Sequence, residues 1–250
     1  MSTLVAAAPG VFWRETKAEF LKAARMPMFA IPTVLLPVGF YALFAVGMGR
    51  GDQSVVTQML ATFGVYAVMG PALFGFGANV ASERESGQLE LKRLSPMPTG
   101  AHIVGKLVAT MAFSAIAIAL IYAVAAMAGV KLSASQWALM ASTQITAVIP
   151  FALIGLGVGY RMGSKSAVAI VNVLFLGMAV MGGLWIPLAL MPEAIQTIAW
   201  VLPSYHLGEL ALMAVGHSEI AYFWLHAGPL ALLSLAAAVF AWTGQQRHAA

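Results

Sequence analysis

The sequence predicts an all-α integral membrane protein with six transmembrane helices and both ends of the chain in the cytoplasm. The first observation is composition: 61% of the 250 residues are apolar and 9% are charged, against roughly 45–50% and about 25% in a soluble domain. The second is that six stretches are long and apolar enough to cross the ~30 Å hydrocarbon layer as helices of about 20 residues. The third is the placement of the basic residues between those stretches.

The six predicted spans leave only short connectors over most of the chain, so we expect one transmembrane domain over residues 1–250. They cover residues 28–48, 55–81, 102–128, 137–160, 166–188 and 221–242. Prolines lie inside several of them, such as Pro32, Pro37 and Pro71. In a membrane helix such prolines are expected to bend the helix, because neighbouring helices can satisfy the freed carbonyls.

Orientation follows from the Lys and Arg residues, which are retained on the cytoplasmic side near membrane spans. With the N-terminus inside, eleven of the thirteen basic residues are cytoplasmic: Arg14, Lys17, Lys22, Arg25, Arg84, Lys92, Arg93, Lys106, Arg161, Lys165 and Arg247. Only Arg50 and Lys131 fall outside. Both termini are therefore expected in the cytoplasm. Residues 1–9 lack the pattern of a cleavable signal peptide, so the first span is expected to direct insertion.

Residues 11–25 are predicted to form an amphipathic helix at the membrane interface. On a helical wheel one arc collects the residues Phe12, Trp13, Thr16, Phe20, Ala23 and Ala24. The charged residues Arg14, Glu15, Lys17, Lys22 and Arg25 occupy the rest. We expect Trp13 and Phe20 to lie at the interface and Arg14, Lys17 and Arg25 to meet anionic headgroups or a cytoplasmic partner. A simple anchor with no further role is the alternative.

The cytoplasmic loop of residues 82–100 holds an unusual mixture of charges and leucines, SERESGQLELKRLSPMPTG. A short helix from about Gln88 to Leu94, ended by Pro96, would present Leu89 and Leu94 away from the membrane. A solvated loop needs no such leucines, so they indicate docking to a protein. The alternative is that they fold back onto the ends of the spans.

The outer segment of residues 189–220 contains no Lys or Arg and is interrupted by Pro192 and Pro203. Its apolar pieces are too short to span, which favours a re-entrant or interfacial helical segment. Among its polar residues we single out Glu193, His206 and Glu209. Glu209 is a candidate for the lining of a translocation path, with a position at the level of the headgroups as the alternative.

No catalytic or metal site is predicted, and the chain is not expected to be an enzyme. The sequence has no cysteine, no Gly-x-Ser-Gly and no histidine pair with the spacing of a metal or haem site within one span. The run Gly159–Ser166 has Ser164 where a phosphate-binding loop requires its second glycine. The basic residues form no patch that indicates a nucleic acid.

The organisation resembles the membrane (permease) subunit of ABC transporters of the type 2 exporter family. The resemblance rests on the amphipathic helix before the first span, the run ERESGQLE at residues 83–90 with Ser95-Pro96 and Gly105-Lys106, and the proline-broken segment before the last span. It implies that residues 82–100 form a coupling loop on a cytoplasmic ABC ATPase. The residues that inherit this role are Glu83, Arg84, Glu85, Gly87, Leu89, Glu90, Leu94, Ser95 and Pro96.

The resemblance further implies a homodimer of the permease in the bacterial inner membrane, with ATP and Mg held by two separate ATPase subunits and no cofactor bound by this chain. The spans carry few polar residues, so an amphiphilic or hydrophobic cargo is expected. Candidates for its path are Asn79, Gln144, Asn172 and Glu209. The alternative function is a membrane scaffold or assembly protein that docks a soluble cytoplasmic partner without transport.

Overall fold

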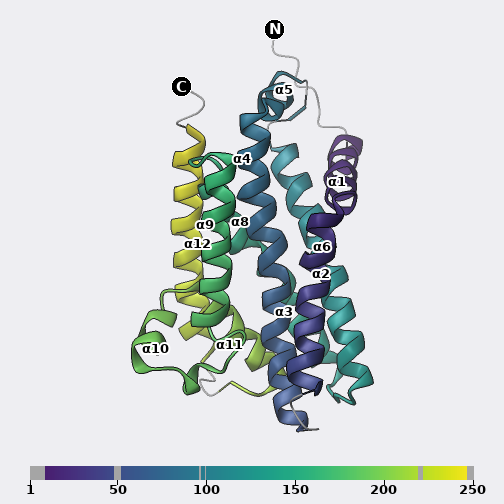
Figure 1. The fold of residues 1–250 in the computed structure, drawn as a ribbon, viewed down its shortest axis with the longest axis vertical. Coiled ribbons are helices and arrows are strands. Elements are labelled where there is room, and N and C mark those ends of the chain that lie inside the picture. The colour runs from purple at the N-terminus through teal and green to yellow at the C-terminus, as the bar shows by residue number, and fades with distance from the viewer. Residues whose placement is uncertain (1–8, 48–51, 96, 99, 219–221, 247–250) are drawn as a thin grey trace.

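The computed structural model describes residues 9–47, 52–95, 97–98, 100–218 and 222–246. Regular structure in these residues is helical throughout, with no strand. Six helical stretches are long and apolar enough to cross a membrane, and a bent helix pair precedes the last of them. The predicted fold class is therefore confirmed. Figure 1 shows the long helices side by side in an elongated bundle.

The six spanning stretches are formed by nine helical segments. They are α2 (Pro27–Phe40) with the π-helical η1 (Tyr41–Gly47), α3 (Gln53–Phe76) with α4 (Ala78–Glu85), α6 (Ala101–Met127), α7 (Ala134–Thr146) with α8 (Val148–Gly159), α9 (Ser164–Met181) and α12 (Phe223–Gln246). The remaining segments are α1 (Pro9–Ala24), α5 (Gln88–Leu94), η2 (Leu188–Leu190), α10 (Glu193–Ala199) and α11 (Pro203–Val215). Of the predicted positions, 48, 50, 96, 99, 219, 220, 221 and 247 lie outside the described residues.

Helix α3 is the centre of the bundle, because nearly every residue from Leu60 to Phe76 is buried. Glycines on α8 let it approach closely where α3 passes into α4. A Cβ on Gly155 would lie 3.0 Å from the backbone nitrogen of Gly77, and one on Gly159 would lie 2.6 Å from the carbonyl oxygen of Phe76. Small residues thus replace side-chain packing by direct backbone contact, as is common between membrane helices.

Helix α9 ends at Met181, earlier than the predicted end at residue 188. Two glycines explain the difference. Gly183 has a φ of 74°, a left-handed conformation that ends the helix at low cost only for glycine. A Cβ on Gly182 would lie 2.1 Å from the hydroxyl oxygen of Ser204, so the chain turns here directly against the start of α11.

The outer segment is a pair of helices, α10 and α11, bent by 87°. Two buried histidines hold the bend to the last span. His206 Nε2 lies 2.9 Å from the carbonyl oxygen of Trp200, and His206 Nδ1 lies 3.2 Å from His226 Nδ1 on α12. Trp200 also stacks on the His226 ring, with 5.9 Å between the centroids. His206 is therefore part of the packing of this end of the bundle.

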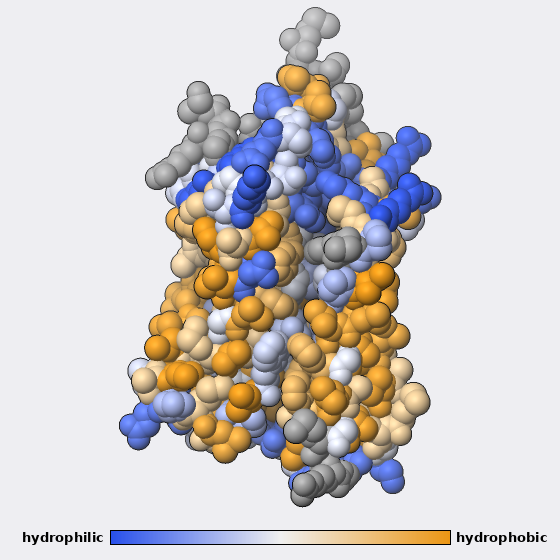
Figure 2. Space-filling view, in the orientation of Figure 1, coloured by the Kyte–Doolittle hydropathy of each residue, from blue (hydrophilic) through white to orange (hydrophobic). Residues whose placement is uncertain are grey.

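The bundle has two chemically different ends. Helices α1 and α5 and the last turns of α12 lie at one end in Figure 1, and α10 and α11 lie at the other. Figure 2 shows hydrophilic side chains concentrated over the end that holds α1 and α5, above a broad hydrophobic band. The N-terminal end of α1 and the C-terminal end of α12 thus lie at the same, strongly charged end of the bundle.

Candidate functional site

Helix α1 lies against α6 at the charged end of the bundle, and one glycine makes the contact possible. A Cβ on Gly105 of α6 would lie 2.9 Å from Glu15 Cγ and 3.1 Å from the backbone nitrogen of Thr16. Farther along the interface, the rings of Phe20 and Phe113 meet edge to face at 6.2 Å between centroids. Helix α1 is therefore held by close packing as well as by its charges.

A carboxylate near the end of α4 joins three elements of this end. Glu83, whose side chain is 3% exposed, accepts hydrogen bonds from Lys22 of α1 and, at 2.8 Å, from Lys106 of α6. Lys106 Nζ also lies 3.1 Å from Glu19 Oε2 of α1. Burying charges is costly unless they are paired and hydrogen-bonded, and here opposite charges alternate.

A second carboxylate group adjoins the first and holds α5. Glu15 and Glu19 of α1 accept hydrogen bonds from Lys92 of α5 at 2.6 and 2.8 Å. His102 Nδ1 of α6 lies 2.7 Å from the same lysine nitrogen. Glu15, Glu19 and His102 have ligand atoms close enough to share a metal ion, but the Lys92 ammonium already supplies the positive charge between them. Together with Lys22, Glu83 and Lys106 these residues form what we call the charge network.

The charge network shifts the pKa values of Glu15, Glu19 and Lys92 in the direction that favours their charged forms. Burial alone would raise the pKa of Glu15, but hydrogen bonds from Lys92 and His102 hold it below its ordinary value. Burial likewise opposes ionisation of Glu19, and the Lys106 charge with the Lys92 hydrogen bond lowers its pKa. Burial would lower the pKa of Lys92, yet its bonds to the two glutamates raise it. Glu15, Glu19 and Lys92 are therefore charged at neutral pH.

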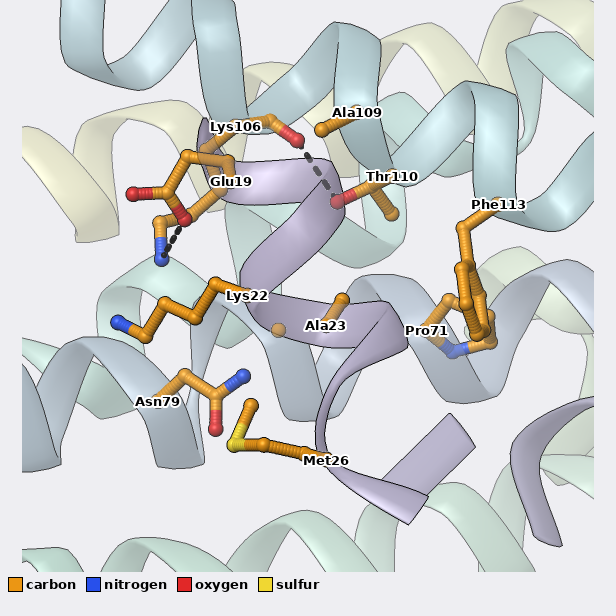
Figure 3. A pocket seen from close by; sticks show the side chains of 11 residues that line it. Glu19, Lys22, Ala23, Met26, Pro71, Asn79, Lys106, Ala109, Thr110 and Phe113 are labelled. Atoms are coloured by element: carbon orange, nitrogen blue, oxygen red, sulfur yellow. Dashed lines mark hydrogen bonds and ion pairs between the residues drawn. The ribbon is translucent and has the colours of Figure 1, made fainter. Parts of the chain in front are cut away.

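A small cavity of about 30 Å³ lies next to the charge network, between α1, α3, α4 and α6. Figure 3 shows Glu19, Lys22 and Lys106 on its polar side, with Asn79 nearby and Phe113 and Pro71 farther along. A volume of this size holds one or two waters. Asn79, predicted as part of a translocation path, thus lines the cavity beside the charge network.

Helix α5 presents a small apolar surface outward. Leu91 and Leu94, three residues apart and so on one face, are 70% and 76% exposed. Leu89, which was predicted to point outward with Leu94, is instead partly buried and packs against the core. Gly87 precedes the helix with a φ of 74°, a conformation that glycine adopts without strain. Ser95 closes it by donating to the Lys92 carbonyl at 2.9 Å.

The charged residues around α5 have unequal exposure. Glu85 and Glu90 are exposed, whereas Glu83 is buried. Arg84 turns to the opposite side of α4 and donates to the backbone carbonyls of Tyr160 and, at 2.7 Å, Met162 in the loop between α8 and α9. Pro96 lies outside the described residues. The predicted coupling residues that the structure describes thus fall into two groups. Some lie on the exposed surface, and others attach α4 to neighbouring elements.

The loop that receives Arg84 is itself attached to the last span. Arg161 lies over the ring of Phe240 of α12, 3.8 Å from its centroid, and donates to Thr243 Oγ1 at 2.6 Å. Since Phe240 and Thr243 lie on α12, consecutive residues of α4 connect to opposite sides of the bundle. Glu83 reaches α1 and α6, and Arg84 reaches the α8–α9 loop and, through Arg161, α12.

The residues predicted for the interfacial helix divide in a similar way. Trp13 is 68% exposed, and Arg14, Lys17 and Arg25 are exposed as well. Phe20 packs against Phe113 instead. Helix α1 thus exposes aromatic and basic side chains, and its acidic side chains face α5 and α6.

Three other predicted path residues lie apart from one another. Asn172 lines a groove of about 840 Å³ between α2, α3 and α9. Gln144 is fully buried, accepts from Tyr122 Oη at 2.8 Å and donates to the Ala61 carbonyl at 3.2 Å, which gives it a packing role. Glu209 lines a separate cavity at the opposite end and accepts from Ser218 Oγ at 2.7 Å. Their part in translocation stays a prediction.

Sequence reasoning missed most of the charge network. His102 was given no role in the charged cytoplasmic segments, and Glu15 was assigned only to the polar side of the helical wheel. The signal available was the spacing of Glu15 and Glu19, two acids four residues apart in an otherwise basic segment, which places both on one face of a helix. Leu91 was missed although it stands three residues before Leu94.

Two comparisons with known proteins agree with this architecture. A family model described as "ABC-2 type transporter" matches residues 11–215, from the start of α1 to the end of α11. A relative from Bacillus subtilis (strain 168), named "Putative transport permease YvfS", is 27% identical over 202 residues, which cover 79% of this chain and 82% of the relative. The matched region contains the charge network, α5 and the bent helix pair.

Proposed function

Because the chain belongs to the ABC-2 type transporter family, we propose that it is the permease of an ATP-driven exporter whose ATPase is a separate cytoplasmic subunit. The observation that carries this proposal is the arrangement of α5, which exposes Leu91 and Leu94 while Lys92 between them is bound to α1. A partner that binds the two leucines thereby acts directly on the charge network. ATP and Mg are bound by the partner subunit in this scheme.

The connections of α4 supply a route for the movement. When the ATPase changes state on binding ATP, its differential affinity for α5 in the two states provides the coupling energy. The displacement of α5 reaches α1 through Lys92 and α6 through Glu83, while Arg84 carries it to the α8–α9 loop. Both sides of the bundle are then moved from one docking point.

The groove between α2, α3 and α9 is the proposed path for cargo, with a second copy of the chain closing its open side. Its wall is mainly apolar and aromatic, including Phe40, Tyr66, Phe74 and Phe175, with Asn172 as a polar residue within it. Such a surface suits an amphiphilic or hydrophobic cargo better than a hydrophilic polymer. The functional unit we propose is a homodimer of this chain with two ATPase subunits in the bacterial inner membrane.

The orientation of this assembly follows from charge. Most of the described basic residues belong to α1 and the residue after it, α4, α5, the start of α6, the α8–α9 loop and the start of α9: Arg14, Lys17, Lys22, Arg25, Arg84, Lys92, Lys106, Arg161 and Lys165. Lys131, in the loop between α6 and α7, is the exception among the basic side chains that the structure describes. The positive-inside rule assigns that end to the cytoplasm. Helix α5 would therefore face the compartment that contains ATP, and α10 and α11 would lie on the outer side.

The test is the double substitution Leu91→Asp with Leu94→Asp. We expect it to abolish co-purification of the ATPase and transport-coupled ATP hydrolysis in proteoliposomes, because two carboxylates would replace the apolar contact. Leu190→Asp makes the same change on η2, at a residue that is 77% exposed at the opposite end, and should leave both intact. An undiminished ATPase interaction in the double variant would overturn the proposal. A chain that binds no nucleotide-hydrolysing subunit at all would favour the scaffold alternative.

A further inference from the structure

A cavity of about 380 Å³ lies at the end of the bundle opposite the charge network, between α3, the segment after α9, and the bent pair α10–α11. Its lining combines three aromatic residues, Trp185, Trp200 and Tyr205, with the carboxylate of Glu209. We call this cavity, lined by those four residues with Gln58 and His217, the outer pocket. Nothing in the coupling scheme above uses it.

The electrostatic character of the outer pocket is negative. Among the described residues that line it there is no Lys or Arg, and Glu209 contributes the formal charge. In the same lining, the Gln58 amide nitrogen lies 3.4 Å from His217 Nδ1. The whole stretch from Pro187 to Ile220 also contains no basic side chain other than histidine. A cation entering the pocket therefore meets the Glu209 carboxylate and no Lys or Arg among the described lining residues.

The aromatic walls are suited to the same kind of ligand and are fixed in place. Indole and phenol faces attract cations through the ring quadrupole. Trp200 and Tyr205 lie 5.3 Å apart between centroids at an interplanar angle of 63°. The carbonyl of Trp200 is bound by His206, and its ring stacks on His226. Aromatic side chains that surround a site with one carboxylate are typical of sites for ammonium groups.

The outer pocket shares one wall residue, Trp185, with the groove between α2, α3 and α9. Trp185 also packs edge to face on Phe40 and Tyr66 of the groove, at 5.4 and 5.3 Å between centroids. A molecule with an apolar body in the groove could thus place a charged group beside Glu209. We propose that the outer pocket binds a lipophilic organic cation; that this cation is cargo rests on the proposed function.

The binding test uses two probes of nearly the same shape and opposite charge, tetraphenylphosphonium and tetraphenylborate. Each is measured by equilibrium dialysis against the full chain in nanodiscs of zwitterionic lipid, with binding to empty nanodiscs subtracted. We expect saturable binding of the phosphonium and none of the borate. Equal saturable binding of the two probes, or binding of the borate alone, would overturn the proposal without any variant.

Two isosteric substitutions assign the site. Glu209→Gln should weaken phosphonium binding about tenfold, since one charge contact in a partly buried site is lost. Glu193→Gln removes the same charge from the exposed start of α10, outside the pocket lining, and should leave binding unchanged. Equal effects of the two variants would contradict the assignment. No ATPase is present in this experiment, so its failure leaves the coupling proposal intact, and loss of coupling in the Leu91 and Leu94 variant leaves this site intact.

Discussion

Glu83 and Lys106 form an ion pair of 2.8 Å between the end of α4 and the first turns of α6, with side chains that are 3% and 6% exposed. The neighbouring residue Arg84 points the other way and binds the loop between α8 and α9. Two consecutive side chains therefore attach α4 to different parts of the bundle. The attachments through Glu83 and through Arg84 can therefore be tested separately.

Glu83→Gln is expected to loosen the charge network from its centre. The substitution removes a carboxylate that faces both Lys22 and Lys106, and breaking a buried pair by removing one partner costs about 3–5 kcal/mol. The midpoint of thermal unfolding in detergent should fall, and ATP hydrolysis should become independent of transport. Glu85→Gln is the matched control, since Glu85 is exposed two residues farther along the same helix. Equal midpoints for the two variants would contradict the central place of Glu83.

Gly105→Ala should separate α1 from α6. The added Cβ would lie 2.9 Å from Glu15 Cγ and 3.1 Å from the Thr16 backbone, closer than methyl groups pack. Overpacking of this kind costs about 1–3 kcal/mol, so backbone amides of α1 should exchange hydrogen faster. Gly100→Ala provides the control five residues earlier, where a Cβ would meet nothing within 4 Å. Unchanged exchange in Gly105→Ala would show that α1 is held without this close contact.

The fold was largely predictable from sequence because hydropathy and the requirement to satisfy backbone polar groups in lipid determine the number and type of spans. The short helix at Gln88–Leu94 also followed from local signals. The face of that helix did not, since whether Leu89 or Leu91 is exposed depends on how α5 is rotated against α1. That rotation is set by Lys92 and its bonds to Glu15 and Glu19, residues more than seventy positions away in sequence.

The same limitation explains why the sequence could not separate the candidate path residues Asn172 and Gln144. Polarity alone grouped Asn172 with Gln144, because a polar side chain within an apolar span has two possible uses. It can face a cavity, as Asn172 does, or bind carbonyls of a neighbouring helix, as Gln144 does. Only the packing around Gly64, which makes room for the Gln144 amide, separates the two cases.

Acid should release α1 from α5. The pKa values of Glu15 and Glu19 are lowered in the fold, so their contribution is present above the ordinary value of 4.5 and is lost as pH falls through the lowered values. The pKa of Lys92 is raised, so its contribution is present below 10.5 and is lost only as pH rises through the raised value. Attachment should therefore be constant across neutral pH and fail well below pH 4.5.

A spin label reports this transition, and the absence of cysteine from the sequence allows a single labelled position. Ala18→Cys places the label on the exposed side of α1, where its mobility should rise in acid. Ser135→Cys, exposed at the start of α7, shows whether the whole bundle unfolds at the same pH. Coincident transitions at the two positions, or no transition on α1, would contradict local release.

Gly64→Ala should be among the most damaging single-methyl changes in the spans, and a second substitution should repair it. A Cβ on Gly64 would lie 2.0 Å from Gln144 Nε2 and 2.2 Å from its Cδ, so the amide must leave its place. The hydroxyl of Tyr122 and the carbonyl of Ala61 would lose their partner, at about 1–3 kcal/mol for each buried polar group. Gly70→Ala on the same helix would place its Cβ 3.5 Å from the Phe175 ring and 3.9 Å from Thr33 Cγ2, which are ordinary contacts, and should be tolerated. The rescue by Gln144→Ala is a separate test, because this substitution empties the space that the new methyl group needs. The double variant, Gly64→Ala with Gln144→Ala, should therefore unfold at a higher temperature than Gly64→Ala alone. The coupling is measured as the difference between the loss of stability of the double variant and the sum of the losses of the two single variants. Additive losses would mean that Gly64 and Gln144 do not share this site.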